Sequence, residues 1–192
     1  MKVWTIAALC LVPGAAWGQT AAFKCAKPGT VVQYQDGSWT EWVNQEANYC
    51  RVNHKRRNEA DPRLSDWYAP MASVSINSTI DRPWLDQVKP QAIWPLSVGK
   101  KLSGRYDGAN NTGTSHGSWT FTFTVEKYER ITTKAGTFDT FAITRTQEGI
   151  GRPFKEKWTQ WYAPEPGVVV RYDYWNNQGR TNKGDAVAIK GR

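Results

Sequence analysis

Aromatic and basic side chains are the residues of this chain whose types and spacing could bind a ligand. The 192-residue sequence has 11 tryptophans and a formal net charge of +8. Indole rings fill cores first, but Trp158 and Trp161 have opposite strand parity, so one of them must leave the packed face of a sheet. The residues predicted to contact a ligand are Trp119, Trp158, Trp161, Tyr162, Arg145 and Arg171. Stacking and apolar burial would supply affinity, and the basic residues would select anionic ligands.

Catalytic signals are few. His116, next to Ser115 and Ser118, is the one candidate for a Ser-His-Asp hydrolase, but no Gly-x-Ser-x-Gly elbow accompanies it, and a solvated loop histidine is the simpler interpretation. Four glutamates could meet across strands as a carboxylate pair for glycoside hydrolysis. They are Glu126, Glu129, Glu148 and Glu156. Charged residues on a solvent face explain them more simply, so the sequence favours a non-enzymatic protein.

Metal and nucleotide sites have little support. The two histidines, His54 and His116, are far apart in the sequence, whereas a transition-metal site needs clustered His, Cys or carboxylate ligands. No Gly-rich phosphate loop precedes a helix pattern. We therefore predict no metal and no cofactor.

Residues 1–18 have the pattern of a cleaved signal peptide. An uncharged apolar run covers residues 3–12, and Ala16 and Gly18 are small residues where a signal peptidase cleaves. The run is too short for a membrane span, which needs about 20 apolar residues. We therefore predict a periplasmic or secreted protein without a transmembrane segment in its mature chain.

Cysteine usage agrees with export. Cys10 would leave with the signal, and the remaining pair, Cys25 and Cys50, is predicted to form a disulfide. Such a bridge would contribute roughly 3 kcal/mol in the chain-entropy model. A lipoprotein acylated at Cys10 is the alternative, but Leu9 stands where a small residue would be needed.

Antiparallel strands must position these side chains. Residues 118–174 hold four segments rich in β-branched and aromatic residues, which alternate near period two and are separated by Gly, Pro, Asn or Lys. The segments are 119–125, 135–143, 158–164 and 167–172, and they predict a four-strand meander. No stretch keeps a helical period. We predict an all-β fold, a twisted antiparallel sheet curled into a half barrel or open barrel.

Two short motifs occur twice along the mature chain, predicted as one domain over residues 19–192. Gly-Ser-Trp-Thr is found at 37–40 and 117–120, and Trp-Tyr-Ala-Pro at 67–70 and 161–164. This repetition supports the hypothesis of two related halves, 19–77 and 96–192. Residues 78–95 carry three prolines, which argue against a long helix, and predict a linker that packs its two tryptophans.

Three segments occur in an order that resembles a known group of proteins. They are Trp-Pro-Leu-Ser-Val-Gly-Lys at 94–100, Ala-Gly-Thr-Phe-Asp-Thr-Phe at 135–141, and Trp-Tyr-Ala-Pro-Glu-Pro-Gly-Val-Val-Val-Arg at 161–171. Together they resemble small exported Gram-negative proteins of unknown function, whose pattern couples an apolar-Gly-Lys strand, an Ala-Gly-Thr-Phe turn and a Trp-Tyr-Ala/Ser-Pro strand. The resemblance covers residues 94–174. It implies an antiparallel β domain in the periplasm. It does not assign an activity, because it carries over no catalytic residues.

The sequence thus favours a non-enzymatic periplasmic binding or carrier protein. The expected partner is an envelope lipid, glycan or anionic polymer, held on a concave, Trp-rich face. Nucleic acid would suit the pI of 9.5, but export argues against it. Two alternatives stay open. An envelope polysaccharide hydrolase needs two carboxylates about 5 to 9 Å apart in one cleft, and a structural or assembly factor would show an exposed edge strand and no concave pocket.

Overall fold

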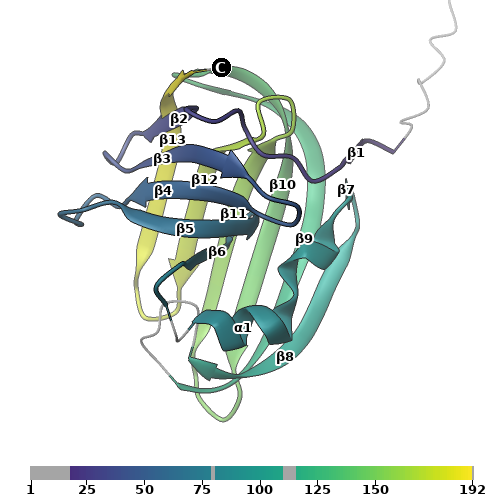
Figure 1. The fold of residues 1–192 in the computed structure, drawn as a ribbon. Coiled ribbons are helices and arrows are strands. Elements are labelled where there is room, and N and C mark those ends of the chain that lie inside the picture. Colours follow the sequence, from purple (N-terminus) through teal and green to yellow (C-terminus); the bar gives the residue numbers. More distant parts are fainter. Residues whose placement is uncertain (1–17, 79–80, 110–115, 192) are drawn as a thin grey trace, which may run out of the picture.

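The computed structural model of the chain describes residues 18–78, 81–109 and 116–191. Within these ranges, one 11-stranded antiparallel sheet has the strand order β6-β5-β4-β3-β2-β13-β12-β11-β10-β9-β8, and β1 (Thr20–Ala21) pairs separately with β7 (Leu96–Ser97). The edge strands β6 and β8 do not pair with each other, so the sheet is curled but open (Figure 1). The predicted all-β class is confirmed. Residues 1–17 of the predicted signal peptide lie outside the described residues.

Five short strands form what we call the N-terminal wing of the sheet. They are β2 (Val31–Tyr34), β3 (Trp39–Gln45), β4 (Cys50–Lys55), β5 (Arg63–Ala69) and β6 (Ala72–Ser75). Each strand pairs antiparallel with the next. The turn between β2 and β3 uses Gly37 with a φ of 85°, a conformation that glycine adopts without steric cost.

Six longer strands form the C-terminal wing. They are β8 (Lys101–Ala109), β9 (His116–Thr133), β10 (Gly136–Gly149), β11 (Lys155–Ala163), β12 (Val168–Asn176) and β13 (Thr181–Lys190). Strands β9 to β12 are consecutive antiparallel neighbours. The meander predicted for residues 118–174 is therefore confirmed, although its strands are longer than the segments read from the sequence.

The two wings face each other across the hydrophobic core. Strand β13 pairs with β2 and so joins the wings into one sheet, and Figure 1 shows β2 to β6 crossing in front of the long strands β10 to β12. Between the wings, the Trp67 and Tyr162 rings stack at 6.0 Å, and the Tyr34 hydroxyl donates to the Val169 carbonyl at 2.9 Å. The inner face of each wing is thus covered by the other wing.

The segment predicted as a linker contains two short helices, α1 (Asp81–Val88) and η1 (Pro90–Ile93). Helix α1 packs against both edge strands, β6 and β8, where the sheet would otherwise be open (Figure 1). The Gln87 side-chain amide bonds both to the backbone carbonyl of Asp107 at 3.0 Å and to its backbone N–H at 2.9 Å. It caps part of edge strand β8 in the way that a neighbouring strand would.

The predicted disulfide is present. Cys25 and Cys50 are bonded, with their Cα atoms 5.6 Å apart, and the bridge ties the N-terminal segment to β4. The Tyr162 hydroxyl donates to the carbonyl of Lys24 beside this bridge at 3.0 Å. The N-terminal segment is therefore attached to both wings.

The repeated motifs take matching places in the two wings. Gly-Ser-Trp-Thr stands at the start of β3 and of β9, and Trp-Tyr-Ala-Pro at the end of β5 and of β11, so each pair of motifs encloses three consecutive antiparallel strands. The relation between the two halves stays a hypothesis.

Candidate functional site on the outer face of the sheet

Cross-strand pairing divides the six predicted ligand residues between the two faces of the C-terminal wing. Arg145 pairs with Trp158, and Trp161 pairs with Arg171. Since side chains alternate along β11, Trp158 and Trp161 point to opposite faces. Arg145, Trp158, Tyr162 and Trp119 face the interior, whereas Trp161 and Arg171 lie on the outer face. The six residues do not form one site.

The interior members of this set pack as core residues. Trp119 and Tyr162 have no exposed surface. The Trp119 ring stacks on Tyr106 at 6.4 Å and meets Phe154 edge-on at 5.5 Å. The concave face on which a ligand was expected is covered by the chain's own side chains, so these rings contribute first to the fold.

Arg145 was predicted as part of a basic rim, and the structure places it in a buried ion pair instead. Its guanidinium lies 2.7 Å from Glu156, and the two side chains are 1% and 2% exposed. Arg145 also donates to the Met71 carbonyl at 3.2 Å and lies 5.5 Å from the centre of the Trp158 ring. The Tyr174 hydroxyl donates to the second Glu156 oxygen at 3.2 Å. The Arg145 charge is thus balanced inside the protein.

The outer face of β11, β12 and β13 carries a ladder of polar and aromatic side chains. Strand β12 pairs residue by residue with β11 on one side and β13 on the other, so every second residue of the three strands faces outward together. We call this set the outer strip. Its three rows are Trp161, Arg171 and Asp185, then Thr159, Asp173 and Lys183, then Lys157, Trp175 and Thr181.

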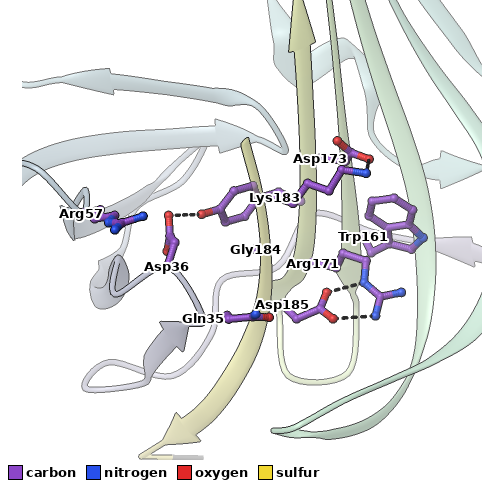
Figure 2. Close-up of a pocket in the computed structure, with 10 residues that line it drawn as sticks. Gln35, Asp36, Arg57, Trp161, Arg171, Asp173, Lys183, Gly184 and Asp185 are labelled. Atoms are coloured by element: carbon purple, nitrogen blue, oxygen red, sulfur yellow. Dashed lines mark hydrogen bonds and ion pairs between the residues drawn. The ribbon is translucent and has the colours of Figure 1, made fainter. Parts of the chain in front are cut away.

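Two ion pairs neutralise four of the five charged side chains of the outer strip, all except Lys157. The Arg171 guanidinium makes two parallel hydrogen bonds to Asp185, one of them 2.9 Å long, and Lys183 lies 3.1 Å from Asp173 (Figure 2). The partnership with Asp185 raises the pKa of Arg171 above its ordinary value. Paired donors and acceptors on an exposed surface suit hydrogen bonding to hydroxyl groups, and Lys157 leaves the strip one positive charge.

Trp161 is held in a fixed orientation at one end of the strip. Its indole N–H donates to Glu129 at 2.7 Å, and the Arg171 guanidinium lies 5.8 Å from its ring centre. Partial burial raises the pKa of Glu129, but hydrogen bonds from Lys127 and Trp161 outweigh it and hold the pKa below its ordinary value. Glu129 therefore stays ionised and keeps the indole in place.

Trp175 lies at the other end of the strip and was not among the ligand residues predicted from the sequence. It is 47% exposed, a large value for a tryptophan. It lies four positions after Arg171 along β12, which corresponds to about 13 Å in an extended strand. The period-two run Arg171, Asp173, Trp175 was the signal that could have found it, because it predicts one shared outward face.

A shallow depression of about 600 Å³ lies over the Trp161 end of the strip and extends across β13 to Asp36 and Arg57 (Figure 2). The Tyr172 hydroxyl donates to Asp36 at 2.6 Å. A Cβ at Gly184 would come within 2.5 Å of the Tyr172 ring, so the glycine at this point of β13 is what lets the tyrosine reach Asp36.

Asp36, a carboxylate of the depression, is a poor general acid. Partial burial raises the pKa of Asp36, but hydrogen bonds from Ser38 and Tyr172 outweigh it and leave the pKa below its ordinary value. A glycoside hydrolase needs one carboxyl with a raised pKa, and Asp173 and Asp185 are both engaged by cations. Among the described residues, no three His, Cys, Asp or Glu side chains gather as metal ligands.

Comparison with known proteins gives a partial family match. The family model described as DUF3108-like matches residues 110–184, less than half of the chain. This stretch contains β9 to β12 and includes two of the three segments on which the resemblance to exported proteins rests, 135–141 and 161–171. No curated protein matches the chain.

Two solved structures are similar to the chain. A proposed exported protein with a YmcC-like fold from Bacteroides fragilis is 13% identical, with a TM-score of 0.44, and the match covers 89% of this chain and all of that one. A proposed lipoprotein from Parabacteroides distasonis is 11% identical, with a TM-score of 0.40, and the match covers 90% of this chain and all of that one. Across residues 18–78, 81–109 and 116–191, no helix has the length and hydropathy needed to cross a membrane.

Proposed function

We propose that the protein is a non-enzymatic, extracytoplasmic binding protein that holds a glycan-like component of the cell envelope on the outer strip. The observation that carries this proposal is the position of Trp175 and Trp161, at opposite ends of one exposed face with paired charges between them. The exposed ring of Trp175 and the half-buried ring of Trp161 would supply apolar stacking area, and the charged and hydroxyl side chains between them would supply directional hydrogen bonds. A sugar polymer offers both kinds of surface in alternation.

Export is part of the same proposal. Its support is the signal-peptide pattern of residues 1–18 together with the disulfide between Cys25 and Cys50, a bond that persists in oxidising compartments. Selection of an anionic glycan would come from Lys157, the fifth charge of the strip, and from the net charge of +8 on the full sequence. Such a long-range field acts mainly on association rate and falls with salt.

The two alternative functions have weaker support. A hydrolase would need a carboxyl poised to give up a proton, whereas the hydrogen bonds to Asp36 favour its charged form. An assembly factor that recruits a strand would need an open sheet edge, whereas α1 packs on both edge strands and Gln87 caps β8 at Asp107.

Replacement of Trp175 by alanine tests the proposal. We would measure retardation of the purified protein in gels containing lipopolysaccharide, soluble peptidoglycan fragments or neutral dextran. If the strip binds a glycan, Trp175→Ala should weaken binding at least about fivefold, the factor that corresponds to the 1 kcal/mol expected for an aromatic contact. Ile150→Ala is the matched control, because Ile150 is also an exposed apolar side chain but lies outside the strip.

Two results would refute the proposal. One is a wild-type protein that none of the polysaccharides retards, at low salt as well as at physiological salt. The other is retardation that Trp175→Ala and Ile150→Ala change equally. If rising salt abolishes binding to lipopolysaccharide but not to dextran, the selectivity for anionic glycans comes from the electrostatic field of the whole protein.

A further inference from the structure

The interior faces of β10 and β11 carry a polar cluster within an otherwise apolar core. Arg145 and Gln147 on β10 lie directly opposite Trp158 and Glu156 on β11. Directly opposite residues of an antiparallel pair have Cβ atoms about 5 Å apart, so the four side chains are neighbours. Gln147 is 1% exposed.

Gln147 has neither of its hydrogen-bonding groups satisfied. Both its Nε2 and its Oε1 are buried without a partner among the described residues, and the same holds for the indole Nε1 of Trp158. Leaving such a group unsatisfied destabilises the folded state. Folded proteins place a hydrogen-bonding molecule against groups of this kind.

The chemistry of the cluster defines the molecule that would fit it. Gln147 offers one acceptor and two donor hydrogens, and Trp158 offers one donor. The neighbouring charges of Arg145 and Glu156 balance each other at 2.7 Å, so a charged guest would have no counter-ion and would pay a large desolvation cost. A small neutral molecule with hydroxyl groups, which both donate and accept, satisfies these atoms.

Trp158 also connects the cluster with the surface. The residue as a whole is half-buried although its Nε1 is fully covered, so its ring reaches from the exterior to the interior cluster. Tyr174, which is half-buried as well, packs against it edge-on at 5.7 Å. These two rings mark the side from which a small molecule would enter.

We propose that Gln147 and Trp158 form a second binding site, inside the fold, for a small hydroxyl-bearing molecule. Ordered water and a sugar hydroxyl share this chemistry, and the experiment distinguishes them. The site is independent of the outer strip, because Trp158 and Trp161 point to opposite faces of β11.

The sign of a stability change tests this proposal. Gln147→Met keeps the size of the side chain and removes both polar ends. If a molecule bridges Gln147 and Trp158, the variant leaves that molecule and the indole N–H without a hydrogen-bond partner. The Tm should then fall by about 2–4 °C, the shift that 1 kcal/mol produces in a chain of this length. If the cluster is dry, the variant removes an unsatisfied amide and the Tm should stay level or rise. Gln178→Met, the same change in an exposed turn, is the control.

A second experiment identifies the bound molecule, and it also tests the proposal if the Gln147→Met variant does not fold. A high-resolution crystal structure of the wild-type protein should show density within hydrogen-bonding distance of the Gln147 amide. Monosaccharide at millimolar concentration should raise the Tm of the wild type and not of Gln147→Met if the guest is a sugar, and should act equally on both if it is water. A level or raised Tm in Gln147→Met, or an empty cluster in the crystal, would overturn the proposal.

Discussion

Replacement of Glu156 by glutamine should destabilise the protein far more than replacement of any exposed carboxylate. Glu156 and Arg145 are 2% and 1% exposed and lie 2.7 Å apart, so the variant leaves the guanidinium in the interior without the carboxylate that balances its charge. Breaking one side of a buried ion pair costs about 3–5 kcal/mol. For a chain of this length, each kcal/mol lowers the Tm by about 2–4 °C, so the combined fall should be about 6–20 °C.

The matched control for Glu156→Gln lies on the same hairpin. Glu148 pairs with Lys155 at 3.1 Å, but both side chains are more than half exposed, and exposed pairs contribute about 0–1 kcal/mol. Thermal and urea unfolding, followed by near-ultraviolet circular dichroism with the disulfide intact, would measure both variants. The double variant Arg145→Met with Glu156→Leu should recover most of the loss, because apolar residues can replace a buried pair at little cost. Equal effects of Glu156→Gln and Glu148→Gln would refute this reasoning.

Two further predictions concern the disulfide and Asp36. Replacing both Cys25 and Cys50 by serine should lower the free energy of unfolding by roughly 3 kcal/mol, because the bridge joins residues 25 positions apart; urea unfolding that matches the wild type would contradict it. The folded-state pKa of Asp36 is lowered, so its contribution to stability is present above the unfolded value of 3.8 and is lost as pH falls through the folded value. When the free energy of unfolding is measured from pH 5 to strongly acidic pH, the Asp36→Asn variant should therefore lose less stability than the wild type. Parallel plots of unfolding free energy against pH for the two proteins would show that Asp36 contributes nothing.

Local sequence patterns were sufficient to predict the class of the fold. Period-two alternation and the spacing of turn residues predict the strand order of the meander. An even pair of cysteines in a chain expected to be exported predicts the disulfide. The short helix α1 was not predicted as such, because only two turns of helix leave little periodicity to detect. Its buried Trp84, packed edge-on against Tyr106 at 6.4 Å, shows that tertiary contacts stabilise it.

The faces of individual side chains were harder to predict, because bulges change strand parity. The register between β11 and β12 shifts between Trp161 and Tyr162, and the register between β9 and β10 shifts between Ala142 and Ile143. After such a shift, residues an even number of positions apart no longer share a face. Arg145 illustrates a second limit, since its partner Glu156 becomes visible only once β10 and β11 are in register.

The architecture assigns different ligand sizes to the two proposed sites. The wings cover each other's inner faces, so a polymer can reach the C-terminal wing only from outside, where Trp161, Trp175 and the paired charges lie. A guest of Gln147 must be small, because it has to pass Trp158 and Tyr174 and fit among side chains that are almost fully buried. Strand β11 contributes to both sites through alternate residues. A substitution at Trp158 should therefore leave polysaccharide binding unchanged, and one at Trp175 should leave the response to a monosaccharide unchanged; cross-effects would mean that the two faces of β11 are not independent.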